Sequence, residues 1–334
     1  MCDKSAVIYH AQMPEWFTRF CAAPPMQRIR RVGMNCGCEY TSFPRFRRLP
    51  PYSRYRHSVG AGLITWHFTG SMEQALAALF HDIATPVFAH TVDFMHGDYL
   101  RQEYTEGRTE SIIADSPELS ALLGEYGIPL SAVSDYHIYP IADNDSPRLS
   151  ADRLEYTLGN LSGFARREAA CLQAYYDDIC VATAEDGAPE LAFKTADTAL
   201  AFGWDALEMS RIYVAPEDRY AMQRLSELLK KAVGRGAVSM EELYGTEDAV
   251  IARLRSDAEL CAEWERYCAL HRMLSRDEIL AGNADSRVIP AKKRSIDPLV
   301  LDKGRLSAIS AEFAEELQSF MEQPLDAPIC GVGV

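Results

Sequence analysis

Residues 78–90 read ALFHDIATPVFAH, and the adjacent pair His81 and Asp82 is the most informative feature of the stretch. The residues SMEQ at positions 71–74 form a capping box, and apolar residues follow at helical spacing. We therefore expect a helix from about residue 72 to the His-Asp pair. Adjacent helical side chains point about 100° apart, so these two can reach one ion only from neighbouring directions. Pro86 should then stop a regular helix.

Two other segments carry the same kind of side chain. His57 lies in RYRHSVG (54–60), and Asp152 lies in LSADRLEY (149–156). Ser150 is expected to cap a helix, which puts Asp152 in its first turn. Imidazole and carboxylate together suit a divalent transition metal and leave coordination positions for water and substrate, as a metal hydrolase requires. We predict one metal site with the ligands His57, His81, Asp82 and Asp152.

The order of these ligands, together with their flanking residues, resembles the HD superfamily of metal-dependent phosphohydrolases. The three segments are similar to that family's TRFxHSxGV, HDxGHxPFxH and LDADRxDY motifs, and they look most like the deoxynucleoside triphosphate triphosphohydrolase branch. The resemblance covers roughly residues 25–298. It implies a mainly all-α fold, with an HD helical core and further C-terminal helices. It also implies one divalent ion (Mn, Fe, Ni, Zn or Mg).

The resemblance also assigns roles around the metal. It implies that Asp82 and His90 handle a proton and that His90 and Arg54 contact a substrate phosphate, with Arg153 and Tyr156 as further substrate contacts. Thr85 and Thr109 replace two histidines of the triphosphohydrolases, and Glu110, beside Thr109, is predicted to act as a base or to orient one. With two imidazoles missing, we expect a smaller phosphate ester or a nucleoside mono- or diphosphate to be a better substrate than a deoxynucleoside triphosphate.

Three alternatives remain open. One is a deoxynucleoside triphosphate triphosphohydrolase, and another is a nucleotide-binding regulator without turnover. The third is an HD-type di-iron oxygenase, for which His90 and His96 would have to hold a second iron. His96 and His137 are weaker candidates for a second metal or a substrate contact. Asp143 and Asp145 are candidates for extra carboxylates near Asp152.

The composition of the chain limits the classes of molecule that it is expected to bind. The chain has 334 residues and a formal net charge of −14, which argues against general binding to nucleic acid but allows a local cationic pocket for a small phosphorylated substrate, a nucleotide being the first candidate. No apolar run approaches 18 residues, so no membrane span is expected. Nine cysteines without a framework spacing, including Cys36 and Cys38, suggest structural thiols in a cytoplasmic protein. Homo-oligomerisation is left open.

Periodicity predicts the remaining elements. We expect a core at 1–163 and a helical extension at 164–334. Further predicted features are helices at 165–182, 196–213, 217–233 and 306–322, a capping box at Ser256, a loop at 139–149 and two short strands within 288–300.

Overall fold

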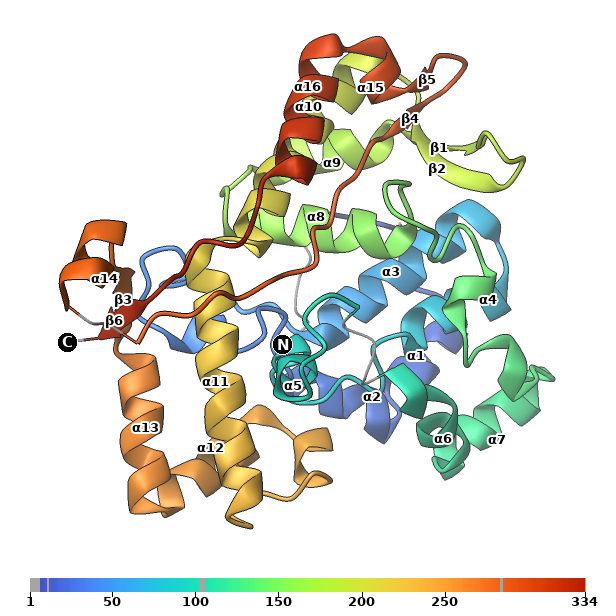
Figure 1. Ribbon diagram of the computed structural model, residues 1–334. Coiled ribbons are helices and arrows are strands. Elements are labelled where there is room, and N and C mark those ends of the chain that lie inside the picture. The colour runs from blue at the N-terminus through green and yellow to red at the C-terminus, as the bar shows by residue number, and fades with distance from the viewer. Residues whose placement is uncertain (1–6, 11, 102–105, 283–284, 334) are drawn as a thin grey trace.

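The computed structural model describes residues 7–10, 12–101, 106–282 and 285–333, and it is mainly α-helical, as predicted (Figure 1). The α-helices of the described residues are α1 (Glu15–Cys21), α2 (Pro24–Arg28), α3 (Arg54–Thr69), α4 (Met72–Phe80), α5 (His90–Met95), α6 (Thr109–Ala114), α7 (Pro117–Tyr126), α8 (Ala151–Gly163), α9 (Ala169–Asp177), α10 (Ala196–Tyr213), α11 (Pro216–Gly234), α12 (Glu247–Ser256), α13 (Ala258–Cys268), α14 (Arg276–Gly282), α15 (Leu306–Ile309) and α16 (Ala311–Glu322). Among these residues no helix combines the length and apolar character needed to cross a membrane.

Short strands form two small sheets at the periphery. They are β1 (Ile179–Thr183), β2 (Pro189–Phe193), β3 (Leu270–Met273), β4 (Leu299–Val300), β5 (Gly304–Arg305) and β6 (Gly331–Gly333). The larger sheet has the order β1-β2-β4-β5, in which only β2 and β4 run parallel. β3 and β6 pair antiparallel. The sheets join segments distant in sequence.

Three packed helices, α3, α4 and α8, carry the candidate ligands. α3 packs against both α4 and α8. Their starts are fixed by side-chain caps, because Ser53, Ser71 and Ser150 each accept a backbone N–H three residues further on. Leu154, Leu158 and Leu161 are buried, so the stripe predicted for α8 does hold that helix in the core.

Buried apolar residues form two large clusters. The first lies beneath α3, α4 and α8 and extends from Val7 to Phe313. The second joins α5 to α11, α12 and α13. Both clusters contain residues from before and after Gly163, the last residue of α8 and the end of the predicted core. The division into a core at 1–163 and a helical extension packed on it stays a prediction.

One predicted helix partly forms a hairpin instead. α9 ends at Asp177, and residues 179–183 (ICVAT) pair with β2. Gly187 adopts φ 86° in the turn between the strands, a conformation that favours glycine. The β-branched residues and the Asp-Gly pair at 186–187 are therefore hairpin signals that outweighed the helical pattern.

Two predicted helix ends and one strand prediction also change. Asp257, rather than Ser256, caps α13, because its carboxylate accepts the N–H groups of Glu259 and Leu260. The predicted helix at 306–322 divides into α15 and α16, since Ser310 caps the second. Within 288–300 the only strand of the described residues is β4, and residues 289–297 have no regular secondary structure but follow an extended course (Figure 1).

Residues 289–297 form a long connection between α14 and β4, which we call the strap. The strap leads from the α14 end of the molecule to β4 and passes α11 and α8 (Figure 1). Ser146 and Pro147, in the loop before α8, contact its distal end. The Ser146 hydroxyl donates to the Ser295 carbonyl (2.9 Å), and the Asp297 N–H donates to the Pro147 carbonyl (2.8 Å).

Candidate metal centre

Helix ends bring the predicted ligands together. His57 lies one turn into α3, His81 is the residue at the C-terminal cap of α4, and Asp152 is the second residue of α8. The Nε2 atoms of His57 and His81 are 3.1 Å apart, and Asp152 Oδ1 lies 2.9 Å from the first and 3.5 Å from the second. Among the described residues this triad is the only group of three or more His, Cys, Asp or Glu side chains positioned to hold an ion.

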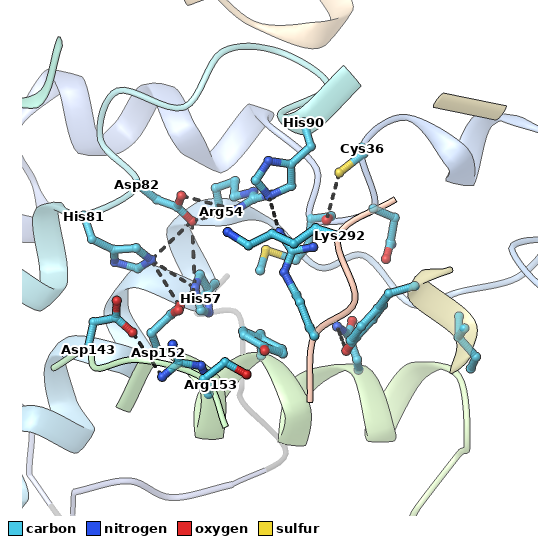
Figure 2. Close-up of a pocket in the computed structure, with 18 of the residues that line it drawn as sticks. Cys36, Arg54, His57, His81, Asp82, His90, Asp143, Asp152, Arg153 and Lys292 are labelled. Carbon is cyan, nitrogen blue, oxygen red and sulfur yellow. Dashed lines mark hydrogen bonds and ion pairs between the residues drawn. The ribbon is translucent and has the colours of Figure 1, made fainter. Parts of the chain in front are cut away.

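Asp82 completes the set from the other side of the imidazole pair (Figure 2). Its Oδ2 lies 3.5 Å from His81 Nε2 and 3.8 Å from His57 Nε2. Two ligand atoms bound to one ion at 2.0–2.2 Å and separated by roughly 90–110° would be about 2.8–3.6 Å apart. Most of the observed spacings fall in that range.

The hydrogen bonds on the far sides of the rings show that this cluster requires a cation. His81 Nδ1 lies 2.6 Å from the Ala78 carbonyl, and His57 Nδ1 lies 2.6 Å from Glu155 Oε2. Both partners are acceptors, so both Nδ1 atoms carry hydrogen and donate. In the neutral imidazoles, the Nε2 lone pairs then face each other and two carboxylates. Only a proton or a metal ion can stabilise this arrangement, so the residues fit a divalent ion.

The electrostatics agree with the ligand assignment. Burial opposes the charged forms of both residues, yet hydrogen bonds with Asp152 and Glu155 raise the pKa of His57 to about 10, and the neighbouring histidines lower the pKa of Asp152 to about 2. Without an ion, a proton on His57 thus occupies the place of the missing positive charge.

Glu155 is a site residue that the sequence did not single out. It is buried, and besides His57 it accepts hydrogen bonds from the Tyr52 and Tyr9 hydroxyls. Gly60 makes room for it, because a methyl group there would overlap the Glu155 side chain. A carboxylate that holds a ligand imidazole orients the ring and raises its basicity. The sequence signal that could have identified Glu155 is its spacing, because it lies one helical turn after Asp152.

Arg54 and Thr85 hold Asp82 in place. Arg54 Nη1 lies 3.2 and 3.0 Å from the two carboxylate oxygens, and the Thr85 hydroxyl donates to Oδ1 at 2.7 Å. Although burial opposes it, the positive charge of Arg54 keeps the pKa of Asp82 well below its usual range. Arg54, predicted to contact substrate, therefore also positions a candidate ligand. Thr85, which stands where the triphosphohydrolases have a histidine, helps to orient the Asp82 carboxylate.

The triad opens into a cavity of about 280 Å³. The cavity is lined by the predicted substrate contacts Arg54, His90, Arg153 and Tyr156, and by His137 and Asp143 among the weaker candidates. Arg153 pairs with Asp143 at 3.3 Å and donates to Asn144 Oδ1 at 2.6 Å, so it also ties the 143–150 loop to α8. Burial and the nearby Asp152 raise the pKa of Asp143. Asp145 is exposed and does not line the cavity.

His90 is held between two charged partners. Its Nδ1 lies 2.9 Å from Asp93 Oδ2, and Arg294 Nη2 lies 3.3 Å from its Nε2. Nδ1 thus donates to Asp93, and Nε2 accepts from Arg294. Burial, assisted by Arg294 and Arg54, lowers the pKa of His90. His90 is therefore neutral at physiological pH, with an acceptor nitrogen directed toward the cavity wall.

Two predicted roles lack geometric support. Glu110 is exposed on α6 and does not line the cavity, so the structure does not bring it to the predicted catalytic position. His96 is exposed and also lies outside the cavity lining. Within the described part of the chain, His90 and His96 therefore do not form the second ligand set that a di-iron oxygenase requires.

Comparison with known proteins supports the chemistry only in outline. No family model matches the chain. It is 25% identical over 209 residues to the uncharacterised protein YdhJ of Bacillus subtilis, and the match spans 61% of each protein. It is also 25% identical over 290 residues to the metal-dependent phosphohydrolase cns2 of Cordyceps militaris, covering 81% of this chain and 79% of that protein. This similarity and the His-His-Asp cluster together support a general phosphohydrolase function.

Proposed function

We propose that the chain is a divalent-metal phosphohydrolase that hydrolyses a nucleotide or other small phosphate ester, with water attacking phosphorus. The observation that carries the proposal is the convergence of two imidazole Nε2 lone pairs and two carboxylates at one end of a cavity that arginine and lysine side chains also line. The fungal relative, a metal-dependent phosphohydrolase, supports the same class of reaction.

The ligand set proposed is His57, His81, Asp82 and Asp152. A divalent ion there would supply Lewis acidity to a phosphoryl oxygen and to water. Glu155 and the Ala78 carbonyl fix the ring orientations, and Arg54 keeps Asp82 anionic. These contacts hold the donor atoms in place before substrate arrives, so little reorganisation is needed at the moment of reaction.

The proton-handling residues are proposed from their protonation states. Neutral His90 can accept a proton at Nε2 when Arg294 moves to an anionic ligand. Asp143 has a raised pKa and lies near Asp152, so its carboxyl group is suited to deliver a proton to the leaving oxygen. Asp82, predicted to take part in proton transfer, is a poor base because its pKa is held low, and its proposed role is reduced to that of a ligand.

The test is a substrate panel on the purified chain. Nucleoside mono-, di- and triphosphates and simple phosphomonoesters would be incubated with Mn, Fe, Co, Ni, Zn or Mg, and the products separated. We expect metal-dependent release of orthophosphate. Release of triphosphate from a deoxynucleoside triphosphate would instead support the triphosphohydrolase alternative, and nucleotide binding without turnover would support the regulator.

A further inference from the structure

The strap contributes cations to the cavity from far along the chain. Lys292 and Arg294 both line the cavity, although the metal ligands lie between residues 57 and 152. In an extended segment, residues two apart point to the same side, and the residue between them points to the other. Lys293 follows this rule, because its ammonium donates to the carbonyls of Met321 (2.6 Å) and Gln323 (2.5 Å) at the end of α16. Lys293 borders the cavity but is engaged elsewhere.

The strap is held by hydrogen bonds near both ends. The buried Arg219 donates to the Ile289 carbonyl at 2.5 Å, and the Asp297 carboxylate accepts the N–H (2.9 Å) and the hydroxyl (2.5 Å) of Ser307. The loop before α8 contacts Ser295 and Asp297, as described above. A segment anchored in this way presents its side chains without a large ordering cost on binding.

Lys292 and Arg294 of the strap add to the two arginines beside the metal centre, Arg54 and Arg153. Arg54 pairs with Asp82, and Arg153 pairs with Asp143. Arg294 donates to the neutral ring of His90 and also acts electrostatically on Asp218, a further carboxyl group of the cavity lining, and Lys292 Nζ donates to the Arg101 carbonyl at 2.9 Å. Figure 2 shows Lys292 and His90 on the side of the pocket away from Asp143 and Arg153. In a protein of net charge −14, two strap cations at this wall have a purpose beyond solubility.

We propose that the substrate carries a second anionic group, a phosphate or a carboxylate, and that Lys292 and Arg294 bind it while the scissile phosphate lies at the metal centre. This deepens the proposed function and rests on it for the position of the scissile phosphate. Arg294 offers a planar fork of N–H donors that matches either anion, and Lys292 adds a point charge. The ligand would replace His90 as an acceptor of Arg294, which links recognition of the second anion to release of His90 Nε2.

The experiment measures binding and turnover separately. Propyl phosphate, propanediol bisphosphate and phosphooxypropanoate are titrated calorimetrically into the Mn²⁺-loaded full chain, and orthophosphate release is measured in parallel. The variants are Lys292→Gln and Arg294→Gln. Lys303→Gln and Arg276→Gln are matched controls, because both residues are exposed and lie outside the cavity lining.

We expect propanediol bisphosphate, phosphooxypropanoate or both to bind at least about tenfold more tightly than propyl phosphate. Each strap variant should weaken the preferred di-anionic ligand by about 10- to 100-fold, the range of a charge-assisted hydrogen bond, and change propyl phosphate binding by less than about twofold. The two di-anionic ligands distinguish phosphate from carboxylate.

Two results would overturn the inference: no preference of the wild type for either di-anionic ligand, or an equal loss of mono- and di-anionic ligands in both variants. The second would mean that the strap only positions the cavity. If binding shows the expected preference but no ester of any class is hydrolysed with any metal, the proposed function fails while recognition of the second anion stands.

Discussion

Replacing Glu155 by Gln should weaken metal binding without removing a ligand. Glu155 accepts a hydrogen bond from His57 Nδ1–H at 2.6 Å inside the core. The substitution removes the negative charge that makes the imidazole a stronger metal ligand through Nε2. Loss of such a partner typically lowers metal affinity 10- to 100-fold, which is about 1.4–2.8 kcal/mol. Gly60→Ala should act in the same direction, because the added methyl group displaces Glu155.

The assay is competition between the protein and a chromophoric chelator for Zn²⁺ or Mn²⁺, with metal content checked by elemental analysis. Glu208→Gln is the control, since Glu208 is exposed on α10. Circular dichroism and the melting temperature of the metal-free proteins report whether the fold persists. If Glu155→Gln retained wild-type metal affinity within about twofold while folded, the orienting role assigned to Glu155 would be wrong.

Three further outcomes are expected. His81→Ala or Asp82→Ala should abolish metal retention and hydrolysis while the far-ultraviolet spectrum stays helical, and a variant with full metal and activity would refute the ligand assignment. Arg54→Ala should raise KM and also lower metal affinity about tenfold or more, because Arg54 contacts both carboxylate oxygens of Asp82. A raised KM with unchanged metal affinity would mean that Arg54 contributes to substrate binding only. The raised pKa of His57, about 10, places a proton where the ion binds. Metal binding near pH 7 should therefore release about one proton, and metal affinity should rise about tenfold per pH unit. Calorimetry in buffers of different ionisation enthalpy measures the released protons, and a result of no proton release would contradict this expectation.

Much of the candidate site could be predicted because its ligands lie at helix ends with local signals. Ser71 and Ser150 are recognisable caps, and the structure shows both in that role. Once these helices are fixed, His81 and Asp152 have little freedom in where they point. The loop at 139–149 was also predictable, since prolines and Asn144 interrupt helical periodicity there.

Other parts depend on contacts between distant residues. The contact of Arg294 with His90 joins positions more than two hundred residues apart, and neither residue's neighbours indicate it. The exposure of Glu110 depends on how α6 docks, which periodicity in such a short helix does not determine. Glu155 lies between these cases, since its spacing was visible but its bond to His57 required the packing of α3 on α8.

The first apolar cluster has a consequence for biosynthesis. It includes Phe17 near the start of the described chain and Leu306 and Phe313 near its end, and the latter two pack over Gly203 of α10. Contacts over such long separations slow folding, because the loop between them must close before they form. A newly made chain therefore contains every candidate ligand well before it contains Leu306 and Phe313, which complete the apolar cluster beneath the ligand helices.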